Sequence, residues 1–413
     1  LAAALAIANL AKQPVPDIVN KAYGEAKLAF GKTYLIPKPL DPRLITTIAP
    51  AVAKAAMESG VAKTHIDDWE AYELDLQERI GIDQRLMSRV VTRAKKDPKR
   101  VLFAEADNPK ILKAAQIMRD EKIGIPILLG NKQKIKKLIA TNSLDLGDVT
   151  VIDPSEDKAK LKSYAQLFYD KRKRKGLTQH EAKKLMKERN YFGAMMVEVG
   201  EGDALISGLT KDYPRTILPS LQIIGVKKGV DKVAGMYIMN SNKGPLFFAD
   251  TTVNENPSAD ELVEIIGLTA NGVRFFDIEP TIAILSYSNF GSAKGRVPEK
   301  TALATAKAKA QFPDLVIEGE MQANVALDEG IQKENYPFSA LINHKANTLI
   351  FSDLASGNIA YKLVAEIGNS EAIGPILLGM NKSVHILQLG SSIREIINMV
   401  AIAVVDAQTI ASE

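Results

Sequence analysis

The chain has 413 residues, which is too long for one ordinary hydrophobic core, so two domains and an appendage are expected. Its 46% apolar and 25% charged residues are typical of a globular protein. The net charge of +4 is too small to favour a nucleic-acid partner. The absence of cysteine excludes disulfides, thiolate metal sites and a cysteine nucleophile, and it is consistent with the cytoplasm, where we expect the protein.

The first 79 residues are predicted to be helical and to form a linker region. The apolar run from Leu1 to Leu10 is too short to span a bilayer and lacks the basic region of a signal peptide, so we interpret it as the end of a preceding domain and expect no membrane contact. Prolines at 14 and 16 break this helical part, and three prolines between Ile36 and Arg43 predict a stiff connector. Residues 43–62 return to helical spacing, and residues 65–78 form a second, more polar joint.

From about residue 84, short β-branched runs alternate with amphipathic helices. The expected strands are 101–104, 126–129, 149–152, 204–207, 233–239, 245–248, 281–287, 315–318, 348–352, 375–378 and 384–388. The expected helices include 109–120, 157–173, 259–271, 300–311 and 393–407. This alternation predicts an α/β fold with two doubly wound, mainly parallel sheets and a cleft between them. We expect one domain at 80–222 with a return at 377–413, and a second domain at 223–376.

Two strand-to-helix junctions carry polar residues that suit a phosphorylated ligand. The first junction contains Ser286, Ser288, Asn289, Gly291, Ser292 and Lys294, and the second contains Asn358, Tyr361 and Lys362. Glycine turns expose backbone amides, and ligands of open α/β sheets gather at the carboxyl ends of strands. The alternative is that these residues serve turn geometry alone.

Other charged residues have a structural interpretation that is as good as a functional one. The basic run Lys171–Lys175 is either a solvated helix end or an anion site. Glu318 and Glu320 follow a buried strand, where they either face the cleft or stabilise the fold. The four histidines show no metal spacing, so no metal site is expected, and His385 is more consistent with a packed ring than with a base.

Residues 80–413 resemble the phosphate acetyltransferase family. The resemblance rests on several motifs in order: Lys175-Gly-Leu-Thr, Ser286-Tyr-Ser, Gly291-Ser-Ala-Lys, Glu318-Gly-Glu-Met-Gln, Gly357-Asn-Ile-Ala-Tyr-Lys and Gly374-Pro-Ile-Leu-Leu-Gly. The resemblance implies that Arg172 contacts the ligand, together with the two junctions described above. Arg215, three residues before Leu218, is a further candidate ligand contact by its position.

The chain departs from the family at the residues that would carry the chemistry. Where the family usually reads Asp-Leu-Ser-Arg-Gly, this chain has Gln388 and Leu389 before Gly390, and Leu218 replaces a second expected arginine. Glu395 retains only the acidic character of another position. Acetyl transfer needs fixed cationic donors, and the loss of one donor typically costs ~10²–10³-fold in rate. We therefore expect no catalytic residue, while Gln388 and Gly390 are still predicted to line the ligand site.

The first 80 residues resemble the end of the catalytic part of a bacterial malic enzyme. The resemblance is carried by Val15-Pro-Asp, Tyr23-Gly, Ile36-Pro-Lys-Pro and Asp41-Pro-Arg-Leu. It implies a regulatory domain that binds acetyl-CoA or CoA as effector and controls its own malic enzyme catalytic part, with NADP and a divalent metal bound only in that missing part. It also implies a homodimer through the second domain and a higher oligomer of the longer protein. The alternatives are an active phosphate acetyltransferase and a purely structural oligomerisation module.

Overall fold

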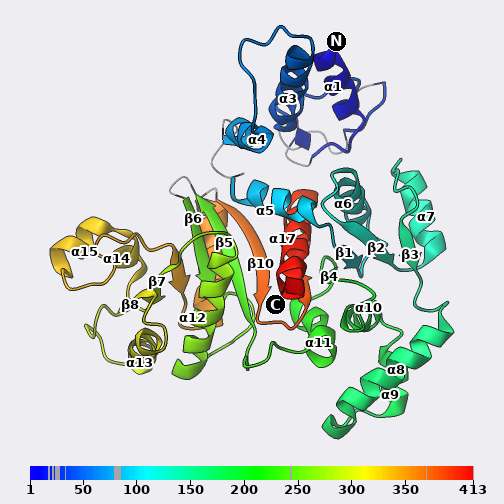
Figure 1. The fold of residues 1–413 in the computed structure, drawn as a ribbon. Helices are drawn as coiled ribbons and strands as arrows, with labels where there is room; N and C mark the ends of the chain where they lie inside the picture. The colour runs from blue at the N-terminus through cyan, green and yellow to red at the C-terminus, as the bar shows by residue number, and fades with distance from the viewer. Residues whose placement is uncertain are drawn as a thin grey trace.

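The computed structural model describes residues 1–16, 19–20, 23, 28–32, 34–78, 85–241, 244–368 and 370–412. The helices α1 (Ala2–Ala11), α3 (Arg43–Glu58) and α4 (Trp69–Glu78) form an N-terminal part that stands apart from the two sheets (Figure 1). The expected boundary between 79 and 80 lies outside the described residues, as do Asp17 and Gly24 of the N-terminal motifs.

The first domain is built on a five-stranded parallel sheet with the order β11-β4-β1-β2-β3. Its strands are β1 (Arg100–Phe103), β2 (Ile125–Leu129), β3 (Thr150–Ile152), β4 (Ala204–Ser207) and β11 (Ser383–Ile386). Its helices are α5 (Arg85–Lys96), α6 (Pro109–Asp120), α7 (Lys132–Thr141), α8 (Lys158–Arg172), α9 (Gln179–Leu185), α10 (Arg189–Glu198), α11 (Tyr213–Ile223) and α17 (Ile393–Ser412), with a 3₁₀ turn η2 (Lys173–Lys175) after α8. This domain has the expected parallel architecture.

The second domain carries a six-stranded mixed sheet with the order β10-β5-β6-β9-β7-β8. Its strands are β5 (Ala234–Ser241), β6 (Gly244–Ala249), β7 (Thr281–Leu285), β8 (Val316–Met321), β9 (Thr348–Ile350) and β10 (Glu371–Leu378). The pairs β10–β5 and β5–β6 are antiparallel, and the remaining pairs are parallel. Its helices are α12 (Ala259–Arg274), α13 (Arg296–Gln311), α14 (Ala323–Leu327), α15 (Glu329–Asn335) and α16 (Leu354–Ile367). The chain therefore has the predicted α/β fold with two mainly parallel sheets.

Local signals explain where several helices begin. Asn108 caps α6 through the amide of Lys110, and Pro109 occupies the first helical position, where its missing N–H costs nothing. Ser258 and Glu261 form a reciprocal capping box at the start of α12, as Thr178 and Glu181 do at the start of α9.

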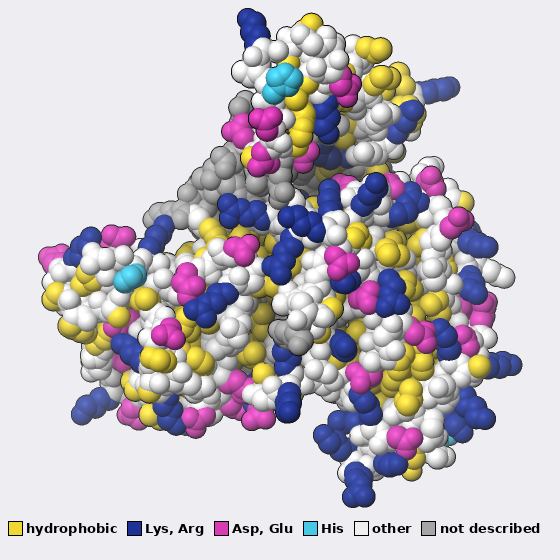
Figure 2. Space-filling model, in the orientation of Figure 1, with side chains coloured by type: hydrophobic (Ala, Val, Ile, Leu, Met, Phe, Trp, Pro, Cys, Tyr) yellow, Lys and Arg dark blue, Asp and Glu magenta, His cyan; other side chains and the backbone are white. Residues whose placement is uncertain are grey.

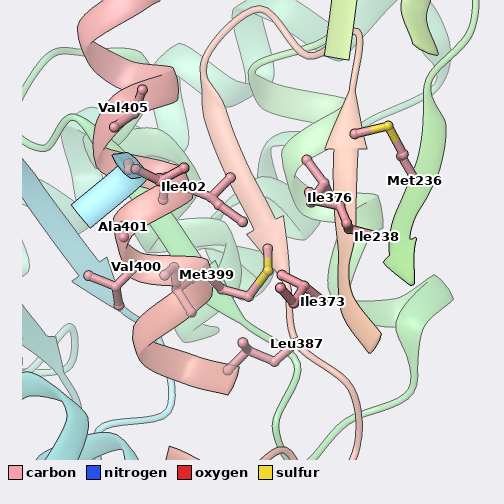
Figure 3. Close-up of a cluster of buried hydrophobic side chains, with 14 of the residues drawn as sticks. Met236, Ile238, Ile373, Ile376, Leu387, Met399, Val400, Ala401, Ile402 and Val405 are labelled. Atoms are coloured by element: carbon pink, nitrogen blue, oxygen red, sulfur yellow. The ribbon is translucent and has the colours of Figure 1, made fainter. Parts of the chain in front are cut away.

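One hydrophobic core runs through both domains, and α17 lies at its centre. Figure 3 shows Met399 and Ile402 of α17 facing Ile373 and Ile376 of β10, with Met236 of β5 at the right of the view. The helix also packs against β11, β4, α5 and α6 of the first domain. A hydrophobic interface of this kind opposes free motion of two domains.

By length and composition alone, α17 could cross a membrane, since its mean hydropathy reaches 1.3. In this structure 56% of that window is buried inside the protein, so α17 is its central core helix.

The two predicted domain limits lie near the ends of elements. Residue 222 lies at the end of α11, and residue 377 lies in the last part of β10, which belongs to the second sheet.

Candidate functional site

The loop 387–391 follows β11 at the junction of the two domains and is fixed by the first domain. The amide of Leu387 donates to the carbonyl of Ser207 at 2.7 Å. The Nζ of Lys110 donates to the carbonyls of Gly390 and Ser391, both at 2.9 Å. Gly390 has a φ of 81°, a left-handed conformation that favours glycine. These contacts within the protein define the shape of the loop.

Gln388 reaches from this loop to the second domain. Its Nε2 donates a short hydrogen bond to the hydroxyl of Tyr361 on α16. The ring of Tyr361 stacks on Tyr237 of β5, with centroids 4.1 Å apart and an angle of 11° between the rings. The side chain of Gln388 thus joins the two domains.

Buried hydroxyls surround this contact, and we call Tyr213, Tyr237, Tyr361 and Gln388 the tyrosine junction. Burial raises the pKa of Tyr237 above its ordinary value, and the nearby Tyr361, Tyr213 and Glu395 raise it further. Burial also raises the pKa of Tyr213, with Thr252 opposing and Asp250 adding to the effect. Among the described residues, the hydroxyls of Tyr213 and Tyr237 have no hydrogen-bond partner of adequate geometry. Both phenols therefore stay protonated and can offer a donor to a polar group that enters the junction.

The positions expected to have lost their chemistry lie at the surface. The side chain of Leu389 is 66% exposed and that of Leu218 is 46% exposed. Both side chains are apolar, so neither provides a polar group. The compensating candidate Arg215 extends into solvent beside Asp212, with its Nε 3.5 Å from the carboxylate. Glu395 caps α17 together with Ser392.

Arg172 lies in a separate pocket of about 420 Å³ between α8, α9 and α11. The wall is formed by Phe168, Arg172, Lys175, Gly176, Leu177, Glu181, Lys184, Leu185, Glu188 and Gln222, none of which belongs to the second domain or to the loop 387–391. Basic side chains gather over this projecting α8–α9 end of the molecule, at the lower right of Figure 2. Lys171 and Lys173 of the basic run pair with Glu198 and Asp170, whereas Arg172 and Lys175 face the pocket.

The first predicted junction, residues 286–294, uses its polar groups to hold itself together. The buried hydroxyl of Ser288 donates to Glu320 Oε1 at 2.9 Å, and the amide of Gly291 donates to the same oxygen at 2.7 Å. The hydroxyl of Ser292 accepts from the amide of Asn289, whose side-chain oxygen in turn accepts from the amide of Gln322. Ser286 accepts from the amide of Ser288 at 3.3 Å, and Lys294 is exposed.

This turn and the tyrosine junction occupy different parts of the second domain. The turn follows β7, and β6 and β9 lie between β7 and β5, which carries Tyr237. The structure therefore brings Gln388 and Tyr361 together, whereas the 286–294 turn follows a strand three places away in the sheet from β5.

The residues of the second junction lie on α16. Asn358 donates to the carbonyl of Thr251 at 3.1 Å, which ties the helix to the loop after β6. Lys362 is exposed, with its Nζ 5.8 Å from the centroid of the Tyr361 ring.

A buried glutamate of the first domain was not found by sequence reasoning. The carboxylate of Glu105, at the end of β1, accepts from the amides of Gly208, Leu209 and Thr210 and from the hydroxyl of Thr210. Such a run of amides is a typical anion site, and here the protein's own carboxylate fills it. The signal in the sequence was the turn at Gly208, which follows the buried strand β4. Its partner, Glu105, lies about a hundred residues earlier in the chain.

Glu318 and His385, the other acidic and imidazole candidates from the sequence, have structural roles. Glu318 accepts from Lys309 Nζ at 2.5 Å and from the amide of Ala340 at 2.7 Å, which stabilises the fold. His385 is a packed ring, 1% exposed, whose Nε2 lies 3.4 Å from a carboxylate oxygen of Asp406 on α17. Within the part of the chain that the structure describes, no three histidine, aspartate or glutamate side chains gather to hold a metal ion.

Comparison with known proteins identifies the family. Residues 85–404 match the family model described as Phosphate acetyl/butaryl transferase. The chain belongs to this family. It is 38% identical to the phosphate acetyltransferase of Clostridium acetobutylicum, over 76% of this chain and 96% of that protein. A solved phosphotransacetylase from Streptococcus pyogenes superposes with a TM-score of 0.72 at 33% identity, covering 80% of this chain and 99% of that one.

A second likeness includes the N-terminal part. The NADP-dependent malic enzyme of Salmonella typhimurium is 39% identical over 99% of this chain, which corresponds to 54% of that enzyme. The NADP-dependent malic enzyme of Escherichia coli matches to the same extent. The chain thus spans about half the length of the malic enzymes that it matches, and residues 1–79 are similar to these enzymes rather than to the acetyltransferase of Clostridium acetobutylicum.

Proposed function

We propose that this chain is a regulatory part of a cytoplasmic NADP-dependent malic enzyme, and that it binds acetyl-CoA without transferring the acetyl group. The observation that carries the proposal is the state of the loop 387–391. Its amide at Gln388 is committed to Tyr361, and its Leu389 extends an apolar side chain into solvent where the family has an arginine. An alkyl group cannot stabilise the charge that develops on phosphate or on a tetrahedral carbonyl oxygen.

The retained groups support binding. Arg172 and Lys175 provide cations in an open pocket, which suits the phosphates of CoA. The phenols of the tyrosine junction are uncharged donors in a buried site, which suits a thioester carbonyl or an amide of the pantetheine arm. Acetyl-CoA that engages the junction would exchange hydrogen bonds with Gln388 and Tyr361.

The route of regulation follows from the shared core. Because α17 packs on β10 within a continuous apolar interface, large separation of the domains would expose core residues. The ligand response is therefore expected to be a shift of the loop 387–391 and of α16. Coupling of this kind is reciprocal, so malate bound by the longer enzyme should change its affinity for acetyl-CoA. NADP and the divalent metal belong to the part of that enzyme outside this chain.

Self-association completes the proposal: two copies pair through the second domain, and the longer enzyme forms a higher oligomer. Its support is the outer side of α16, where the apolar side chains of Ile359, Leu363 and Ile367 are 58%, 52% and 81% exposed.

The proposal is tested by following CoA thiol release from acetyl-CoA in the presence of phosphate. The phosphate acetyltransferase of Clostridium acetobutylicum is the positive control. We expect no release above background from this chain at concentrations where the control turns over. Robust formation of acetyl phosphate would instead identify an active phosphate acetyltransferase.

A further inference from the structure

The helix α5 contacts all three parts of the protein. It touches α4 of the N-terminal part, and its apolar side packs against α17 in the shared core. On its exposed side, the guanidinium carbon of Arg93 lies 5.6 Å from the centroid of the Phe275 ring, which follows α12 of the second domain. The N-terminal part, which is similar to malic enzymes, therefore reaches both α/β domains through α5.

The end of α5 is held by one side chain of α17. The last carbonyls of a helix have no donor within the helix, and the Nε2 of Gln408 supplies one here. This nitrogen lies 2.7 Å from the carbonyl oxygen of Asp97, 3.1 Å from that of Ala94 and 3.4 Å from that of Arg93. The neighbouring Thr409 accepts from Arg93 at 3.1 Å, which fixes the same turn. A donor at this position also opposes the partial negative charge at the end of the helix.

The opposite end of α17 begins directly after the loop 387–391. The hydroxyl of Ser391 donates to the carbonyl of Gln388 at 3.1 Å, so the residue that contacts Tyr361 is tied to the start of the helix. At ~1.5 Å per residue, a shift of the first turn of α17 is carried over about 22 Å to Gln408. The two glutamines at opposite ends of one helix thus connect the tyrosine junction with α5.

We propose that Gln408 transmits the occupancy of the acetyl-CoA site to the N-terminal part. Acetyl-CoA that takes the Tyr361 hydroxyl from Gln388 frees the loop, and the first turn of α17 moves with it. The bonds of Gln408 are directional and weaken steeply with angle, whereas the apolar contacts between α5 and α17 tolerate a small slide. The end of α5 is therefore capped in one state and released in the other. Both the ligand and the N-terminal part bias this one element, as coupling between two sites requires.

This inference rests on the proposed function and names its path of regulation. It is tested in the longer malic enzyme by following NADPH formation from malate with and without acetyl-CoA. The test variant is Gln408→Glu, which keeps the size of the side chain but has no donor at neutral pH. Gln408→Lys keeps a donor, and Gln311→Glu changes an exposed glutamine at the end of α13 as the matched control.

Loss of the cap imitates the bound state, so Gln408→Glu without acetyl-CoA should have the activity of the native enzyme with saturating acetyl-CoA. Its remaining response should be less than about twofold, against the ~5–150-fold that is typical of allosteric coupling. In the 413-residue chain, the same variant should bind acetyl-CoA about threefold or more tightly, because the binding-competent state is more populated. A role of Gln408 in stability alone would lower the midpoint of thermal denaturation without tightening the binding. Gln408→Lys and Gln311→Glu should respond as the native enzyme does.

The outcomes separate this inference from the proposed function. A native enzyme without any response to acetyl-CoA would overturn both. A native enzyme that responds, together with a Gln408→Glu variant that responds equally, would overturn the role of Gln408 alone. If circular dichroism shows that Gln408→Glu is unfolded, Thr409→Val is measured instead, since it removes only the acceptor of Arg93. It should shift the activity in the same direction to a smaller extent, and an unchanged response would again overturn the inference.

Discussion

The strand ends of the two sheets differ from the loop between them in how their polar groups are used. Glu105 in the first sheet and Glu320 in the second are buried carboxylates that fill turns containing Gly208 and Gly291. The side chain of Gln388, by contrast, bonds across the domain boundary. A glycine turn after a strand is thus not by itself a ligand site, because the chain can supply the anion. The ligand contacts are expected where the polar groups lack an internal partner.

The largest effect is predicted for Glu105→Ala. This change leaves three buried amides and a hydroxyl without an acceptor, so the free energy of unfolding should fall by about 4 kcal/mol. Urea denaturation followed by circular dichroism measures the loss. Glu121→Ala, an exposed glutamate on the same sheet's helical layer, should stay within ~0.5 kcal/mol. A loss below ~1 kcal/mol for Glu105→Ala would mean that water replaces the carboxylate in this turn.

Much of the fold could be predicted from the sequence, because local signals mark many element ends. The strand Ala204–Ser207 and the helix Pro109–Asp120 have the predicted limits, since a buried apolar run and a proline at the first helical position define them. The predicted start of β10 at Pro375 was wrong by four residues. Pro375 lies inside β10, which tolerates a proline because it is an edge strand.

The site was less predictable, because its contacts join residues that are distant in the chain. Ser288 was predicted to face a ligand, and it donates instead to Glu320, which lies 32 positions later. Tyr361 and Gln388 were both predicted to line the site, but their mutual contact depends on how the domains meet. No local pattern identified Tyr213 or Tyr237.

The second effect in size is predicted for Glu320→Ala. The buried hydroxyl of Ser288 and the amide of Gly291 lose their shared acceptor, so unfolding should become easier by about 2–3 kcal/mol. The same urea titration measures it, with the exposed Glu334→Ala as control. If Glu320→Ala left stability unchanged but altered acetyl-CoA affinity, the turn would be part of the binding site after all.

Ligand affinity separates the two predicted basic contacts. Arg172→Ala should weaken acetyl-CoA binding about tenfold, because a charge-assisted hydrogen bond in the pocket is lost. Lys294→Ala, at the internally satisfied turn, should change affinity less than about threefold. Calorimetric titration of both variants measures the difference. The reverse ranking would place the ligand over the second domain.

Glu261, which is partly exposed, provides a smaller, pH-dependent contrast to the two buried glutamates. Lys232, followed by the amide of Ser258, lowers the pKa of Glu261 to about 2. Its contribution to stability is therefore complete above the ordinary pKa of about 4.3 and is lost as pH falls toward 2. Thermal denaturation of Glu261→Gln should show a flatter dependence in this pH window. Glu181→Gln should change the curve less, because Glu181 has the same capping bonds but pairs with no lysine among the described residues. If both variants showed the same pH dependence of thermal denaturation, the stabilisation would come from the helix cap alone and not from Lys232.

The smallest effect is predicted where the family chemistry was lost. Gln388→Ser combined with Leu389→Arg should not restore acetyl transfer, because Leu218 still leaves the site without a second cation. Thiol release from acetyl-CoA with phosphate is the measurement. Recovery of turnover in this double variant would show that the loop alone determines activity.

The central claim is that the site binds acetyl-CoA although its chemistry is gone, and calorimetric titration of acetyl-CoA into the 413-residue chain tests it most directly, with CoA as the comparison. Saturable binding that is tighter for acetyl-CoA than for CoA is the predicted result. The absence of heat for both ligands, together with no shift in thermal denaturation, would contradict the claim and leave the chain with an assembly role.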